Sequence, residues 1–153
     1  MATAIIYYSR HHENTKKVLD AIAAKYEVTL IDAATKQHFD LTGYDLIGFA
    51  SGIYYSKFHK SVLQFAENNL PMNKRVFFLY TYGAEKEGYT KSMEAVTLQK
   101  AAKTAGSFGC FGFNTFGPFK LIGGIAKGHP DQDDFDNACR FYENLIKAGK
   151  ETV

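Results

Sequence analysis

The chain has 153 residues, of which 46% are hydrophobic and 22% are charged, a composition typical of one folded globular domain covering residues 1–153. A formal net charge of only +2, with no stripe of Lys and Arg, argues against a nucleic-acid-binding protein. No apolar run reaches the ~18 residues of a membrane span. Cys110 and Cys139 lie in apolar patterns without the spacing of metal ligands, so we expect buried free thiols, no metal and a cytoplasmic protein.

Apolar, β-prone runs alternate with amphipathic helical patterns along the chain. Strands are expected at residues 2–8, 27–31, 46–51, 75–80 and 107–113. Helices are expected from the first loop to about residue 25, at 58–69, at 87–104, and after a cap at Asp131 or Asp133. This alternation predicts an α/β fold, a doubly wound five-stranded parallel sheet with helices on both faces.

The stretch between the first strand and the first helix, Tyr8-Ser9-Arg10-His11-His12-Glu13-Asn14-Thr15, is rich in polar side chains. The N–H groups of a helix's first turn and the positive end of its dipole attract anions. Ser9, Asn14 and Thr15 add side-chain donors without a full charge. The alternative is that Asn14 or Thr15 only caps the helix. This loop is therefore a candidate phosphate site.

Two further loops follow the third and fourth expected strands, Ser51-Gly52-Ile53-Tyr54-Tyr55-Ser56 and Thr81-Tyr82-Gly83-Ala84. With the strand order 2-1-3-4-5, all three loops meet at the carboxyl edge of the sheet, where such folds bind their ligands. Glycine permits close approach of the backbone to a flat ligand, and tyrosine offers a ring for stacking. Together the loops predict a planar ring system that carries a phosphate.

At these motifs the sequence resembles flavodoxin-like proteins that bind flavin mononucleotide (FMN), over residues 5–146. The stretch 51–60 is most similar to the flavodoxin-like protoporphyrinogen oxidase branch. The resemblance implies that the first loop binds the phosphate through Ser9, Arg10, His11, His12, Asn14 and Thr15. It also implies that the other two loops flank the isoalloxazine through Ser51, Gly52, Ile53, Tyr54, Thr81, Tyr82 and Gly83.

The chain departs from the family pattern in three respects. His11-His12-Glu13 replaces the Thr-Gly pair of the usual S-x-T-G-N-T loop and adds one residue. There is no tryptophan to stack on the flavin, so Tyr54 or Tyr55, with Tyr82, must take that place. The sequence pI of 8.4 contrasts with the acidic character of electron-carrying flavodoxins.

The resemblance implies an FMN-binding electron carrier that serves a redox partner protein or a small-molecule electron acceptor. One alternative is a small flavin-dependent reductase or oxidase similar to protoporphyrinogen oxidase, and another is a binding domain on the same scaffold without a flavin. No nucleophile–base pair is readable in the sequence, which fits a protein whose chemistry belongs to its cofactor.

Two other features remain open in the sequence. His59 and Lys60, in the first turn of a helix, are interpreted as a solvated face. The segment 114–130 is too long for an ordinary link and carries Phe116, Phe119 and Ile122 between glycines. It is interpreted either as a lid or partner surface or as a cover for the edge strand of the sheet.

Overall fold

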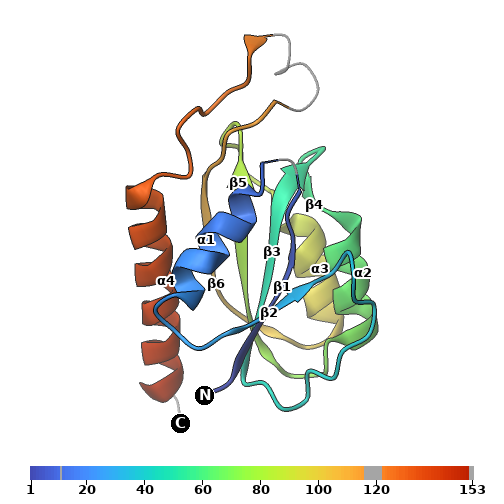
Figure 1. Cartoon of the computed structure of the whole chain (residues 1–153). Coiled ribbons are helices and arrows are strands. Elements are labelled where there is room, and N and C mark those ends of the chain that lie inside the picture. The colour runs from blue at the N-terminus through green and yellow to red at the C-terminus, as the bar shows by residue number, and fades with distance from the viewer. Residues whose placement is uncertain (11, 116–121, 152–153) are drawn as a thin grey trace.

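The computed structural model describes residues 1–10, 12–115 and 122–151. Strands and helices alternate along the chain (Figure 1). They are β1 (Thr3–Tyr8), α1 (Asn14–Ala23), β2 (Thr29–Asp32), β3 (Leu46–Tyr54), β4 (Lys57–Phe58), α2 (Lys60–Asn69), β5 (Arg75–Tyr82), α3 (Lys91–Gln99), β6 (Lys103–Phe111) and α4 (Gln132–Glu151). None of these described helices combines the length and the apolar character needed to span a lipid bilayer.

Five strands form a parallel sheet in the order β2-β1-β3-β5-β6. The short β4 pairs antiparallel with the end of β3 and stands outside this path. Once β4 is set aside, the order is the expected 2-1-3-4-5, so the predicted doubly wound fold is confirmed. Helices α1 and α4 cover one face of the sheet, and α2 and α3 cover the other (Figure 1).

The core is divided between the two faces by the period-2 alternation of the strands. In β1, Ile5 packs toward α1 and α4, whereas Ile6 packs toward α2. In β5, Phe77 and Phe78 divide in the same way, and all four side chains are fully buried. Cys110 and Cys139 are free and buried within the α1–α4 layer, as expected, and burial raises the pKa of the Cys110 thiol to about 12.

Two glycines in the sheet lie beneath aromatic rings of the neighbouring strand. Gly48 of β3 is opposite Phe77 of β5, and a Cβ at Gly48 would lie 2.3 Å from the Phe77 ring. Gly109 of β6 is opposite Tyr80, with a corresponding distance of 2.3 Å. The rings occupy the space that side chains at these two positions would need, so glycine lets large aromatic side chains pack close to the sheet.

We expect Gly48→Ala to reduce the free energy of unfolding by about 1–3 kcal/mol, because the added methyl overlaps the buried Phe77 ring. Urea denaturation measures this loss. Gly43→Ala is the matched control, since a Cβ there meets nothing within 4 Å, and it should change stability by no more than about 0.5 kcal/mol. Equal effects of the two substitutions would contradict this packing.

The boundary between α3 and β6 differs from the expectation. The helix predicted to reach residue 104 ends at Gln99, and the strand predicted at 107–113 runs from Lys103 to Phe111. Ala101 adopts a left-handed φ of 52°, and the N–H of Ala102 donates to the carbonyl of Thr97, which closes the helix. Glycine usually fills such a position, so the helix-favouring Ala101-Ala102 pair concealed the end of the helix in the sequence.

The hairpin of β3 and β4 was not predicted, and β3 continues three residues beyond its expected end. Tyr55 and Ser56 form the turn, with left-handed φ values of 50° and 66°. Tyr54 pairs with Lys57 on either side of them, as in a two-residue hairpin. The Tyr-Ser turn lacks the Asn-Gly or Asp-Gly signature that would have indicated it in the sequence.

Candidate functional site

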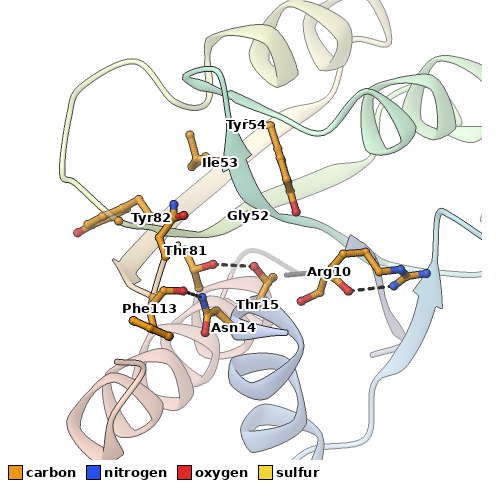
Figure 2. Close-up of a pocket in the computed structure, with 13 residues that line it drawn as sticks. Arg10, Asn14, Thr15, Gly52, Ile53, Tyr54, Thr81, Tyr82 and Phe113 are labelled. Carbon is orange, nitrogen blue, oxygen red and sulfur yellow. Dashed lines mark hydrogen bonds between the residues drawn. The ribbon is translucent and has the colours of Figure 1, made fainter. Parts of the chain in front are cut away.

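A pocket opens at the carboxyl edge of the sheet, where the ends of β1, β3, β5 and β6 meet α1 (Figure 2). The residues that line it are Ser9, Arg10, Asn14, Thr15, Gly52, Ile53, Tyr54, Thr81, Tyr82, Gly83, Gly112, Phe113 and Asn114. Three predicted residues are not among them. Ser51 is fully buried behind the pocket, His12 lines a neighbouring hollow, and His11 lies outside the described residues. All three predicted loops thus contribute to one pocket.

The first loop enters α1 through two left-handed residues, His12 with φ 75° and Glu13 with φ 56°. A left-handed residue followed by helical ones turns successive N–H groups into one concavity that suits an anion. The N–H of Lys16 donates to Ser9 Oγ at 3.0 Å. The N–H groups of Asn14 and Thr15 have no acceptor among the described residues. They point into the turn at the start of α1 and could donate to an anion bound there.

The side chains of Asn14 and Thr15 do not cap the helix, which answers the alternative raised by the sequence. Thr15 Oγ1 lies 2.8 Å from Thr81 Oγ1, and both residues are buried. Two hydroxyls carry two protons, and their mutual hydrogen bond uses one, so the other remains available to a ligand acceptor. The Ser9 hydroxyl also keeps its proton, because Ser9 Oγ acts as the acceptor for Lys16.

Asn14 presents an unsatisfied acceptor at the same place. Its Nδ2 donates to the carbonyl of Phe113 at 2.7 Å, which identifies the other atom as Oδ1. That oxygen is buried and has no hydrogen-bond partner, and the residue is only 9% exposed. Leaving a buried acceptor unsatisfied costs about 1–3 kcal/mol. The site therefore offers donors to an anion and one acceptor to a hydroxyl.

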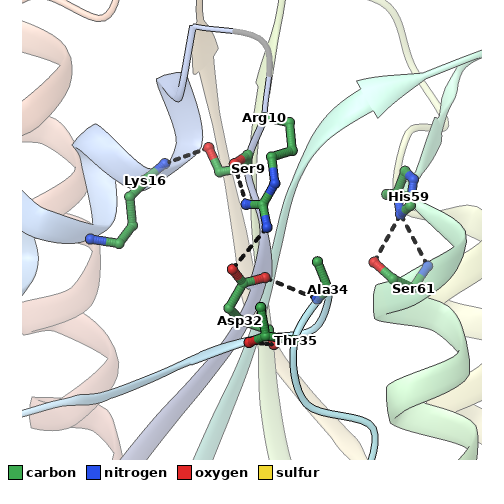
Figure 3. A network of polar contacts seen from close by, with 8 residues as sticks. All are labelled: Ser9, Arg10, Lys16, Asp32, Ala34, Thr35, His59 and Ser61. Atoms are coloured by element: carbon green, nitrogen blue, oxygen red, sulfur yellow. Dashed lines mark hydrogen bonds and ion pairs between the residues drawn. The ribbon is translucent and has the colours of Figure 1, made fainter.

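Arg10 borders the pocket, but its side chain points away from the other lining residues (Figure 2) and toward Asp32 at the end of β2 (Figure 3). Its Nη1 donates to the carbonyl of Ser9 at 2.9 Å, and its Nη2 pairs with Asp32 at 3.1 Å. The hydrogen bond to Asp32 raises the pKa of Arg10. The guanidinium thus holds the loop against the end of β2, a role that sequence spacing did not reveal.

Tyrosines stand on opposite sides of the opening (Figure 2). Burial raises the pKa of Tyr54 to about 12. Burial likewise raises the pKa of Tyr82 to about 12, and its ring packs against Phe111 at 4.9 Å. Tyr55 lies on the hairpin turn with 85% exposure and does not line the pocket. Tyr54 and Tyr82 are the candidates for contact with a ring.

Three residues form a fourth wall that the sequence analysis did not assign to the site. Gly112, Phe113 and Asn114 follow β6, and they were expected to lie in or after a strand ending at residue 113. A Cβ at Gly112 would lie 2.7 Å from Asn14 Nδ2, so glycine is required for the contact between this loop and α1. The other three loops were assigned to the site because each follows the carboxyl end of a strand. The same reasoning would have included residues 112–114 if the last strand had been predicted to end at Phe111.

The segment 114–130 returns to the rim of the pocket. Asn114 pairs with Ile125, and the Ile125 side chain reaches 2.7 Å from the position of a Cβ on Gly83. Ile122 is 70% exposed, so it does not cover the edge strand. Phe116 and Phe119 lie outside the described residues. The described parts of the segment favour a role at the pocket over protection of the sheet edge.

The interpretation of His59 as part of a solvated face is wrong, because His59 is partly buried, whereas the neighbouring Lys60 is exposed. Its ring stacks on Tyr8 at 3.6 Å with an angle of 4° between the planes. Its Nδ1 accepts from the N–H of Ser61 at 3.1 Å and so caps α2 (Figure 3). Its own N–H donates to Ser51 Oγ, whose proton goes to the carbonyl of Gly52. Ser51 therefore holds the second loop in place by hydrogen bonds to the backbone of Gly52 and His59.

The His59 cap makes stability depend on pH, because Nδ1 accepts only when it is unprotonated. Burial, with repulsion from Lys60 and Arg10, lowers the pKa of His59 from 6.5. A lowered folded-state pKa contributes stability above pH 6.5 that is lost as the pH falls through the folded value. Urea titrations at pH 7.5 down to 4.5 should therefore show a steeper acid loss for the wild type than for His59→Asn, which keeps a capping oxygen. Identical acid profiles would contradict this role.

Comparison with known proteins identifies the family. The sequence matches the family described as flavodoxin domain over residues 4–117. The chain belongs to this flavodoxin family. An uncharacterized protein of Methanocaldococcus jannaschii is 36% identical over 149 residues, which cover 96% of this chain and 99% of that protein.

Solved structures of flavodoxins share the fold. A flavodoxin from the domain Archaea has a TM-score of 0.66 and 17% identity, covering 97% of this chain and 99% of that one. Flavodoxin 2 of Bacillus cereus has a TM-score of 0.69 and 17% identity, covering 96% and 99%. The rubredoxin oxygen:oxidoreductase of Desulfovibrio gigas has a TM-score of 0.73 and 16% identity, covering 98% of this chain but 36% of that one. At these identities the likeness concerns the fold.

Proposed function

We propose that this flavodoxin family member is a single-domain, cytoplasmic redox protein that binds FMN and carries electrons through it. The observation that carries the proposal is the combination at the start of α1. There, buried hydroxyl donors and the N–H groups of Asn14 and Thr15 lie beside the unsatisfied Asn14 Oδ1. FMN has an anionic phosphate for the donors and ribityl hydroxyls for the acceptor, so the residues present fit it.

The residues that would hold FMN fall into two groups, one for the phosphate and one for the isoalloxazine ring. Ser9, Thr15 and Thr81 offer hydroxyls to the phosphate, with the N–H groups of the first turn of α1. Tyr54 and Tyr82 offer rings to the isoalloxazine. Gly52 and Gly83 let the backbone approach it closely. Arg10 would act on the loop through its ion pair with Asp32 rather than through the phosphate.

When bound, the flavin supplies the electron-transfer chemistry. The described lining residues of the pocket include no carboxylate, thiol or imidazole that would exchange protons with a substrate. Tyr54 and Tyr82, whose pKa values are raised to about 12, keep their protons at neutral pH. The side chains thus hold and orient the ring and exclude water from it. This favours a carrier, serving a redox partner protein or a small acceptor, over a reductase or oxidase with its own acid–base groups.

The phosphate assignment is tested with Asn14→Ala combined with Thr15→Ala. We expect FMN affinity to fall by about 2–4 kcal/mol, because a side-chain acceptor and a buried hydroxyl donor are both lost. Flavin fluorescence titration of the apoprotein measures the affinity. The control is Thr104→Ala with Asn137→Ala, which removes the same two residue types from exposed positions outside the pocket.

Riboflavin, which lacks the phosphate, should bind the wild type far more weakly than FMN. Its affinity should be almost unaffected by the loss of the Thr15 hydroxyl. Equal affinities for riboflavin and FMN would reject the loop assignment, and failure of both to bind would reject the proposed function. Stepwise reduction of the FMN-loaded protein then distinguishes a carrier that takes up electrons singly from an enzyme that takes them in pairs.

A further inference from the structure

The ring of Tyr54, which lines the pocket, packs against two further rings that do not line it. Its centroid lies 5.7 Å from that of Tyr8 and 5.2 Å from that of His59. It stands nearly perpendicular to both, at angles of 74° and 78°. Tyr8 and His59 are themselves stacked, with centroids 3.6 Å apart and 4° between their planes. Tyr54 is therefore placed in the pocket by a two-ring stack behind it.

The stack is fixed by groups outside the pocket. His59 Nδ1 accepts from the N–H of Ser61 at 3.1 Å and lies 2.8 Å from Ser61 Oγ. The guanidinium of Arg10 lies over the ring of Tyr8, 5.4 Å from its centroid, and pairs with Asp32 at 3.1 Å. The stack is thus held to α2 through His59 and to the end of β2 through Arg10.

His59 can take up a proton within this network, because it is partly exposed in a hollow beside α2. The charges around it oppose that proton. Burial, with repulsion from Lys60 and Arg10, lowers the pKa of His59 from 6.5. Lys36 also lines the hollow, whose described lining includes no carboxylate, and the carboxylate of Asp32 is paired with Arg10. The arrangement therefore favours the neutral imidazole.

Protonation of His59 is incompatible with its place in the stack. The neutral ring accepts at Nδ1, so its proton is on Nε2 and an added proton goes to Nδ1. The N–H of Ser61 then faces a second donor, and the Tyr8 ring, which already has the Arg10 cation over it, receives another positive charge. The imidazolium must turn out of the Tyr8 plane, which removes one of the two rings against which Tyr54 packs.

We propose that His59 is a positioning residue for the flavin: its neutral imidazole, stacked on Tyr8, holds the Tyr54 ring in the place that the isoalloxazine needs. Protonation of His59 releases Tyr54, so the pocket binds the isoalloxazine less tightly at acid pH. This rests on the proposed function, which assigns Tyr54 to that ring. Because the neutral form binds better, affinity is highest above pH 6.5 and falls as the pH drops through the lowered pKa of His59.

Riboflavin is the probe that tests the inference, because it lacks the phosphate, whose second pKa of about 6 would add a pH dependence of its own. Fluorescence titrations of the apoprotein at pH 7.5 down to 5.0 measure the affinity. For the wild type it should fall by about two- to tenfold, the order of one aromatic contact.

Two variants separate the ring of His59 from its capping role. His59→Asn keeps a capping oxygen but has no ring, so it should bind riboflavin more weakly than the wild type at pH 7.5 and show no acid loss. His59→Phe keeps a ring that can stack on Tyr8 and has no site for a proton. It should bind as the wild type does at pH 7.5 and keep that affinity in acid. His38→Asn removes an exposed histidine outside the pocket and should retain the wild-type profile.

NMR spectroscopy of the apoprotein tests the link from His59 to Tyr54 without any flavin. The Tyr54 ring signals, assigned with Tyr54→Phe, should shift with the same midpoint as the His59 ring signals. In His59→Asn they should not shift over that pH range. Tyr54 signals that do not respond to the titration of His59 would overturn the inference.

Three binding results bear on it as well. Riboflavin affinity that stays constant while His59 titrates would overturn the inference. Tight binding by His59→Asn together with weak binding by His59→Phe would assign the effect to the cap of α2 and also overturn it. In both cases FMN binding at pH 7.5 would leave the proposed function intact, whereas failure of FMN and riboflavin to bind at any pH would overturn both.

Discussion

The hydrogen bond from Asn14 Nδ2 to the carbonyl of Phe113 joins the first loop of the chain to the last, across 99 residues of sequence. Three features depend on it. It requires glycine at position 112, it leaves Oδ1 of the same side chain unsatisfied, and it holds the wall formed by Gly112, Phe113 and Asn114 against α1. The parallel sheet makes this contact possible, because it brings the carboxyl ends of β1 and β6 to one edge.

Most of the fold was predictable because it is encoded in local patterns. Buried strands such as β3 are nearly continuous apolar runs, and α4 has its apolar residues on one face, so their existence and order follow from the sequence. The errors arose where left-handed backbone occurs without glycine. Ala101 ends α3, and Tyr55 with Ser56 turns β3 into β4. Residues of these types give no signal of such a conformation.

The site was predictable to the level of loops but not of side-chain roles. Spacing and strand order bring Ser9, Gly52 and Tyr82 to one pocket. They do not reveal that Arg10 pairs with Asp32 or that His59 stacks on Tyr8, because those partners lie on other elements. The extra residue of the first loop is accommodated by the left-handed pair at His12 and Glu13, which no family pattern with Thr-Gly at this place would indicate.

The ion pair between Arg10 and Asp32 ties the loop after β1 to the end of the neighbouring strand β2. The same guanidinium donates to the carbonyl of Ser9, so the loop that opens α1 is held by the sheet as well as by the helix. Asp32 is not among the described residues that line the pocket. A substitution of Asp32 would therefore change the shape of the pocket from a position outside it.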